Sequence, residues 1–137
     1  MKHTFNSLKA PEPVGSYPHA KKVGSLLFLS GVGPRVRGSK DIPGVTLNSS
    51  GEIINYDIEK QCLSVFNNVR QILNESGSGW KNIVDVTVFL TNMKDDFSKF
   101  NQIYSEYLEG FEVTRTTVEV GSLPTPILVE FKVVAHK

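Results

Sequence analysis

The sequence predicts a single α+β domain, in which two helices pack on one face of a mixed β-sheet. A chain of 137 residues with 39% hydrophobic content can bury one core. Two segments carry apolar residues at the spacing of amphipathic helices, and the other apolar runs are short, as strands are. We therefore expect one domain, residues 1–137, in the order strand–strand–loop–helix–strand–helix–strand–strand.

The first part of the chain is expected to form an extended segment, a hairpin and a long loop. Residues 1–16 contain two prolines and little periodicity, which favours an extended path. Residues 18–23 and 26–30 predict two strands joined by a Gly-Ser turn. Residues 33–56 are rich in Gly, Pro, Ser and Asn, and a loop of this length is usually functional or partly disordered. Within it we expect one short strand, at residues 52–55.

Two helices follow, each predicted by an apolar stripe. The first spans residues 57–75, where Asp57 can cap the start and Gly77 and Gly79 can end it. Its stripe consists of Ile58, Cys62, Val65, Phe66, Val69, Ile72 and Leu73. The second helix is expected at residues 96–108, where an aspartate favours the helix start. Its stripe consists of Phe97, Phe100, Tyr104, Tyr107 and Leu108. At this spacing these side chains indicate core packing rather than a platform for stacking bases.

The remaining strands are expected at residues 83–91, between the helices, and at residues 115–120 and 127–135, after them. In the first of these, Val84, Val86, Val88 and Leu90 alternate with Asp85, Thr87 and Phe89. Two helices cover only one face of such a sheet, and the other face still carries apolar side chains. We therefore expect a second copy of the chain to cover it, since exposed apolar surface favours aggregation.

The composition argues against several functional classes. Fifteen basic and 14 acidic residues leave a formal charge of +1, which disfavours nucleic-acid binding through bulk electrostatics. Cys62 is the single cysteine, which excludes an intrachain disulfide and a multi-cysteine zinc site, and we expect it to be buried. The three histidines lie near the chain ends, where we expect surface residues rather than metal ligands. No apolar run is long enough to span a membrane and no signal peptide is recognisable, so a cytoplasmic location is expected.

The last third of the chain carries the most informative side chains. Arg115 begins one strand and can hold a carboxylate through two parallel hydrogen bonds. Glu130 lies between Val129 and Phe131 in the last strand, where a carboxylate is costly to bury unless it is paired or employed. On adjacent strands the two would suit a small carboxylated substrate. Both side chains can equally point into water, as polar residues of a half-exposed strand do.

The chain resembles the Rid family of reactive-intermediate imine deaminases, also called YjgF or L-PSP-like proteins. The resemblance runs from about residue 10 to residue 135 and rests on the order of several short motifs. These are Val14-Gly15-Ser16-Tyr17, Leu29-Ser30-Gly31, residues 86–90, Phe100-Asn101-x-x-Tyr104, residues 114–120, Leu123-Pro124 and Val129-Glu130. The resemblance implies a chorismate-mutase-like fold and a homotrimer with clefts between subunits. It also implies hydrolysis of 2-imino acids and their enamine tautomers to 2-oxo acids and ammonia, without metal or organic cofactor.

The resemblance also implies roles for particular residues. The family arginine that holds the substrate carboxylate matches Arg115, and the family glutamate beside the attacking water matches Glu130. Tyr17 matches the tyrosine of the cleft, and Ser30-Gly31 matches the Ser-Gly pair after the second strand. Our hypothesis adds the backbone N–H groups near Gly31 and Thr117 to the carboxylate site. Ser30 is expected to form a hydrogen bond rather than to act as a nucleophile.

The chain departs from the common family pattern in three places. Many members have a cysteine where this chain has Thr117, so a thiol-dependent step is excluded at this position. The segment Met93-Lys94-Asp95-Asp96, expected as a loop, lacks the asparagine of many members. The loop that contains Arg35, Arg37 and Lys40 is longer than usual and is similar to that of 2-aminomuconate deaminases. One of these three basic side chains can hold the distal carboxylate of such a substrate, or the loop is simply a solvated basic segment.

Several functions therefore remain open at this stage. The first alternative is an enzyme, either a 2-aminomuconate deaminase or a general scavenger of 2-imino acids. Some family members are described as endoribonucleases or translation inhibitors, although the near-neutral charge and the absence of an RNA-reading motif disfavour this function. A non-catalytic protein that binds a small ligand in the same cleft is the third alternative. A hydrolase needs Glu130, whereas a binding protein does not.

Overall fold

The structure is a computed structural model, and it describes residues 2–137. It contains one six-stranded sheet in the order β1-β2-β3-β8-β6-β7 and a separate two-stranded sheet, β4-β5. The strands of the large sheet are β1 (Thr4–Phe5), β2 (Ala20–Val23), β3 (Leu26–Leu29), β6 (Ile83–Leu90), β7 (Thr114–Glu119) and β8 (Val129–His136). The remaining elements are β4 (Val45–Leu47), β5 (Ile53–Tyr56), the helices α1 (Ile58–Glu75) and α2 (Met93–Leu108), and the short 3₁₀ helix η1 (Trp80–Asn82).

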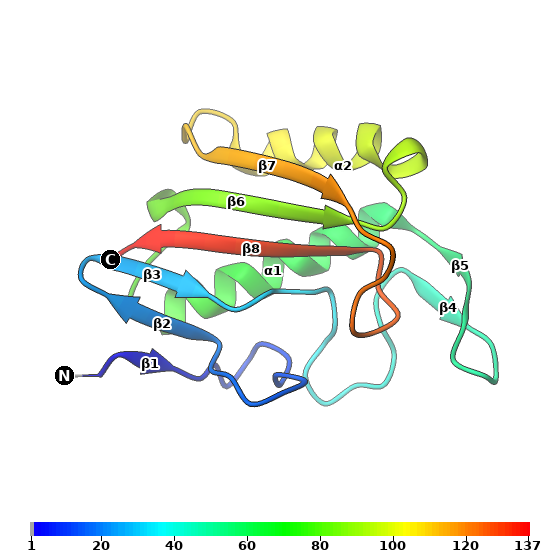
Figure 1. Ribbon diagram of the computed structural model, residues 1–137, viewed down its shortest axis with the longest axis horizontal. Coiled ribbons are helices and arrows are strands. Elements are labelled where there is room, and N and C mark those ends of the chain that lie inside the picture. Colours follow the sequence, from blue (N-terminus) through cyan, green and yellow to red (C-terminus); the bar gives the residue numbers. More distant parts are fainter. Residues whose placement is uncertain (1) are drawn as a thin grey trace.

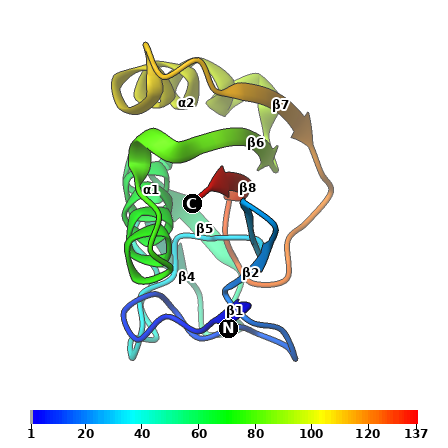
Figure 2. The same ribbon diagram turned by 90° about the vertical axis from the view of Figure 1, so that its left-hand side faces the viewer.

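The two helices pack on the same face of the large sheet, as the sequence predicted. Figure 1 shows β8 between β3 and β6, with the helices behind the sheet, and Figure 2 shows both helices on one side of it. The core lies between these layers. There the ring of Phe131 on β8 contacts Phe66 of α1 and Phe100 of α2, with centroids 5.1 and 6.1 Å apart. The predicted α+β class and the helix stripes are confirmed.

The helix ends follow local capping rules. Asp57 caps α1 by accepting hydrogen bonds from the N–H groups of Glu59 and Lys60, as predicted. Gly77 follows the last turn at φ +77, a left-handed conformation that glycine adopts easily. The predicted start of α2 at Asp96 is wrong. The side chain of Asn92 accepts a hydrogen bond from Asp95 N, so residues 93–96 form the first turn of α2 rather than a loop.

The strand order corrects one expectation from the sequence. β7 and β8 are not adjacent, because β6 lies between them and pairs with both. The crossover through α2 brings β7 back parallel to β6, whereas β8 pairs antiparallel on its other side. β7 is therefore an edge strand of the large sheet.

The long loop predicted at residues 33–56 contains more order than expected. β4 and β5 pair as an antiparallel hairpin, and β5 covers residues 53–56 rather than 52–55. The Tyr56 hydroxyl donates to both carboxylate oxygens of Asp96, at 3.1 and 3.0 Å, and thereby ties the hairpin to α2. Asp96 is buried, with 3% of its surface exposed. Neither helix in the described part of the chain is apolar enough over a sufficient length to cross a membrane.

Candidate functional site

Glu130 lies on the face of the sheet opposite the helices. In β8 its neighbours Val129 and Phe131 are buried toward the helices, so the alternation of the strand turns Glu130 to the open face. Its carboxylate packs against Gly31, where an added Cβ atom would come within 2.6 Å of Oε2. Burial raises the pKa of the Glu130 carboxyl, and the Arg35 guanidinium opposes this rise to a smaller extent. A carboxyl that holds its proton more readily suits a group that both takes and returns protons.

A small hollow surrounds Glu130 and contains three of the other predicted site residues. Its volume is about 120 Å³, and it is lined by Val14, Tyr17, Gly31, Gly33, Arg35, Pro124, Thr125, Ile127 and Glu130. Tyr17 is 41% exposed, and its hydroxyl accepts a hydrogen bond from Val14 N at 3.3 Å. The N–H groups of Ser30 and Val32 are bonded to His19 O and Phe131 O, whereas the Gly31 N–H has no such partner among residues 2–137.

Ser30 lines a smaller adjoining cavity of about 40 Å³, together with Tyr17, Gly31 and His19. Its hydroxyl donates a hydrogen bond to Pro18 O at 2.7 Å, in keeping with the structural role expected for it. The expectation that His19 is a surface residue is wrong, because only 7% of it is exposed. Its Nδ1 accepts a hydrogen bond from Ser7 N, and its Nε2 lies 2.7 Å from Pro11 O. With both ring nitrogens engaged by backbone, His19 is not placed to activate Ser30.

The three basic residues of the long loop occupy different surroundings. Arg35 lines the hollow beside Glu130, and its Nη2 donates to Glu12 O at 2.8 Å. Arg37 points instead at the N-terminal segment, where it donates to Ser7 O and Ala10 O and forms an ion pair with Glu12 at 3.0 Å. Lys40 is exposed and lines a surface depression together with Arg35 and Arg37, and that depression does not include Glu130. The structure thus brings Arg35 to Glu130 and leaves Arg37 and Lys40 apart.

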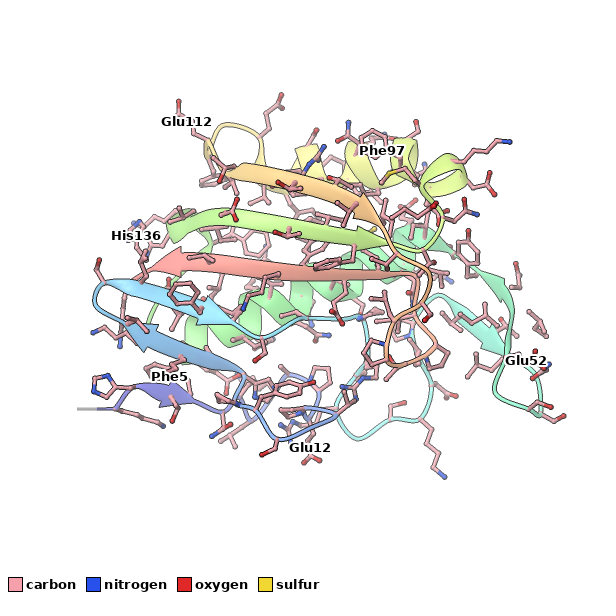
Figure 3. All side chains as sticks on the ribbon, viewed as in Figure 1. Phe5, Glu12, Glu52, Phe97, Glu112 and His136 are labelled. Atoms are coloured by element: carbon pink, nitrogen blue, oxygen red, sulfur yellow. The ribbon has the colours of Figure 1, made fainter. Side chains whose placement is uncertain are left out.

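Arg115 lies on the helix side of the edge strand β7. Its Nη1 donates a hydrogen bond to Asn101 Oδ1 of α2 at 2.8 Å. Its guanidinium also faces three rings of that helix, with Cζ 4.6 Å from the Tyr104 centroid, 5.4 Å from Phe100 and 5.9 Å from Phe97. Figure 3 labels Phe97 on α2, close to β7. Thr117, two residues farther along the same face, has a buried hydroxyl without a hydrogen-bond partner among residues 2–137.

Arg115 and Glu130 therefore lie on opposite faces of the sheet within one chain. The strand between them shows this directly, since Arg115 aligns with Val86 of β6 and Glu130 aligns with Phe89. Val86 and Phe89 are three positions apart, an odd step, and side chains alternate between the two faces along a strand, so they point to opposite faces. One chain thus carries two groups of predicted site residues: Glu130 with Tyr17, Ser30, Gly31 and Arg35, and Arg115 with Thr117.

Comparison with known proteins places the chain in a family. Residues 7–137 match the sequence profile described as endoribonuclease L-PSP. The chain belongs to the endoribonuclease L-PSP family. A RutC family protein of Pyrococcus abyssi is 38% identical over 129 residues, which cover 94% of this chain and 92% of that protein.

Solved structures agree with this assignment. A crystal structure of a conserved Rid family protein from Yersinia pestis superposes with a TM-score of 0.76 at 33% identity, covering 93% of both chains. The structure of TdcF from Escherichia coli with bound serine superposes with a TM-score of 0.82 at 26% identity, covering 99% of both chains. The predicted resemblance to the Rid family is confirmed.

Two features of this L-PSP family chain were missed from the sequence. The sequence places Asn101 only in a family motif and Tyr104 in that motif and in the core stripe of the second helix, and the contacts of both with Arg115 require α2 and β7 to be packed side by side. The buried state of His19 depends on Ser7 and Pro11, which no periodicity links to it.

Cys62 is buried as expected, and burial raises the pKa of its thiol to about 12. Within residues 2–137, no three His, Cys, Asp or Glu side chains are grouped to hold a metal ion.

Proposed function

We propose that this protein hydrolyses small 2-imino and enamine carboxylates to 2-oxo acids and ammonia, at sites formed between copies of the chain. The observation that carries the proposal is the pair of half-sites in one protomer. One half offers Glu130, a carboxyl whose pKa is raised by burial, in a hollow beside Gly31 and Tyr17. The other half offers the guanidinium of Arg115 at the sheet edge. Together they supply an anion clamp and an acid–base group.

The separation of the half-sites by β6 supports a closed oligomer as the active form. A single chain cannot apply Arg115 and Glu130 to one small substrate from opposite faces of its sheet. A neighbouring copy can present the Arg115 edge to the open face that carries Glu130. Repeating this contact head to tail closes a ring, and we propose the homotrimer that the resemblance implies. Apolar side chains on the open face, such as Phe28 at 37% exposure, support burial by a second copy.

The proposed reaction needs only binding and proton transfer from the chain. Arg115, helped by N–H groups near Gly31 and Thr117, binds the carboxylate beside the C–N carbon. After an enamine tautomerises to the imine, Glu130 takes a proton from water as the water oxygen bonds to that carbon, and the nitrogen receives the proton. Glu130 then carries the hydroxyl proton of the carbinolamine to nitrogen, the C–N bond breaks, and ammonia leaves. One such group contributes about 10²–10⁴-fold.

The structure of TdcF with bound serine supports a small substrate of this chemistry, because serine carries a carboxylate beside a C–N carbon. The position of Arg35 supports a narrower class. Its guanidinium lies close enough to Glu130 to lower the pKa of that carboxyl, and it lines the same hollow. We propose that Arg35 holds the distal carboxylate of a dicarboxylic substrate such as 2-aminomuconate. Arg37 is already engaged by Ser7, Ala10 and Glu12, so Arg35 is the stronger candidate.

The test is ammonia release from 2-aminomuconate, 2-iminopropionate and 2-aminoacrylate, each generated enzymatically. Wild-type protein should accelerate release and Glu130→Gln should not, although its oligomer persists. The variant Arg35→Met should lose activity on 2-aminomuconate selectively, whereas Lys81→Met, an exposed lysine elsewhere on the chain, serves as the charge-matched control. Equal loss on all three substrates would remove the role of Arg35. Unchanged release with the Glu130→Gln variant would refute the proposed mechanism.

A further inference from the structure

The surroundings of Arg115 are unusual for a half-buried arginine, because its hydrogen-bond partner is neutral. Two ion pairs occur within residues 2–137, Arg37–Glu12 and Lys99–Glu59, and neither includes Arg115. Its Nη1 instead donates a hydrogen bond to the side-chain amide oxygen of Asn101, at 2.8 Å. An amide fixes the direction of a guanidinium N–H but leaves its net charge uncompensated. A carboxylate at the same place would form a stronger bond and would cancel the charge.

The aromatic rings of α2 also orient the guanidinium of Arg115 without neutralising its charge. Phe97, Phe100 and Tyr104 follow one another at spacings of three and four, so they lie on one helix face, and that face contacts Arg115. A ring stabilises a cation through its quadrupole and restricts the plane of the guanidinium without neutralising it. Rings and amide together hold the fork of Arg115 in place while its charge stays available to an external anion.

We propose that Asn101 is a positioning residue, which keeps Arg115 both oriented and uncompensated so that it can bind the substrate carboxylate. This inference rests on the proposed function and assigns to α2 a part in that same site. It yields a prediction that a merely structural role would not. If Asn101 only stabilised the fold, a carboxylate in its place would hydrogen-bond Arg115 at least as strongly, and the protein would stay functional. If Asn101 preserves the charge, a carboxylate there should keep the fold and prevent substrate binding.

The decisive variant is therefore Asn101→Asp, which is nearly isosteric. Its matched control is Gln102→Glu, which adds the same charge on the adjacent, exposed residue of α2. Binding of 2-oxobutanoate, a stable carboxylate, is measured by calorimetry, and turnover of 2-iminopropionate by ammonia release. We expect Asn101→Asp to retain the oligomer and its melting temperature while KM and the dissociation constant rise by about tenfold or more. Gln102→Glu should change both by less than about twofold.

The pH dependence provides a second readout. Lowering the pH protonates the introduced carboxylate, so the affinity of Asn101→Asp for 2-oxobutanoate should approach that of the wild type, whereas Gln102→Glu should follow the wild type throughout. If Asn101→Asp does not fold, Asn101→Leu removes the acceptor without adding charge, and its KM should rise by about threefold or more with little change in kcat.

The outcomes separate this inference from the function on which it rests. Wild-type protein that neither binds 2-oxobutanoate nor accelerates ammonia release would overturn both. An active wild type with unaltered binding by Asn101→Asp, or by Asn101→Leu where that variant replaces it, would overturn the role of Asn101 alone. Equal losses in Asn101→Asp and Gln102→Glu would also overturn it, because the effect would then be one of net charge.

Discussion

Two inactive variants of this protein should restore activity to each other within one oligomer. Arg115→Ala removes the anion clamp and Glu130→Ala removes the acid–base group, so each variant alone should be inactive. Because Arg115 and Glu130 lie on opposite faces of the sheet, each site of the proposed oligomer takes Arg115 from one chain and Glu130 from the next. A site is therefore intact wherever a Glu130→Ala chain presents its Arg115 to an Arg115→Ala chain.

The expected recovery follows from the symmetry of a closed trimer. Any trimer that contains both variants has two chains of one kind and one of the other. Around the ring, only one of the three contacts then joins an intact Arg115 to an intact Glu130. Mixed trimers should thus show about a third of the wild-type activity per trimer, whichever variant is in excess.

The assay is coexpression of the two variants with different affinity tags, purification through both tags, and measurement of ammonia release from 2-iminopropionate. Each variant expressed alone provides the background. A trimer of wild-type chains carrying the same two tags provides the reference rate. Mixed trimers as inactive as the single variants, with the oligomer intact, would show that the two residues do not meet across a subunit contact, and the composite site would be refuted.

Three further perturbations test the site and the fold. Gly31→Ala should displace the Glu130 carboxylate, since the new Cβ atom would come within 2.6 Å of Oε2, and kcat should fall by about 10²-fold at little loss of stability. The control is Gly33→Ala, whose Cβ atom would meet only Ile127 Cδ1, at 3.0 Å. A fully active Gly31→Ala variant would contradict the contact between Gly31 and Glu130. The acid limb of the pH profile of kcat/KM should follow ionisation of Glu130, because burial raises the pKa of this carboxyl. Arg35→Met removes a guanidinium that lowers the pKa of Glu130, so the acid limb should move to higher pH. Movement of the limb to lower pH would contradict this effect of Arg35 on Glu130. Tyr56→Phe leaves the buried Asp96 carboxylate without its hydroxyl donor and should lower the free energy of unfolding, measured by urea titration, by about 1–3 kcal/mol. Adding Asp96→Asn to this variant should recover part of the loss. An unchanged stability would show that other contacts hold the β4–β5 hairpin to α2.

Much of the fold could be predicted from the sequence because its elements are determined locally. The apolar stripe of α1 and the Asp57 cap required only residues within the helix itself, and both predictions are confirmed. The predicted start of α2 is misplaced because Asp96 lies within the first turn, whereas Asn92, four residues earlier, makes the cap. The β4–β5 hairpin was largely missed, since its anchor joins Tyr56 to Asp96 across 40 positions of the chain.

The arrangement of the site could not be predicted in the same way. The types of residue at positions 115 and 130 were informative, but the face each side chain takes depends on the register of three strands. A slip of one residue between β6 and either neighbour would turn Arg115 and Glu130 to the same face. The sequence contains no local signal for that register. It is set by burial of Val86 and Phe131 against the helices, together with the crossover through α2.

The same register explains why the polar residues of the site are tolerated in so small a domain. Glu130 and Arg115 each occupy a half-buried place that an isolated fold would fill better with an apolar side chain, and burial already raises the pKa of Glu130. Placing the two on opposite faces keeps them from neutralising each other within one chain, as an internal ion pair would. Asn101 has the matching effect on Arg115, because it provides orientation without a counter-charge. Each protomer therefore retains an uncompensated guanidinium and a carboxyl whose pKa is raised by burial, and in the proposed oligomer the contact between subunits is where the two act on one substrate.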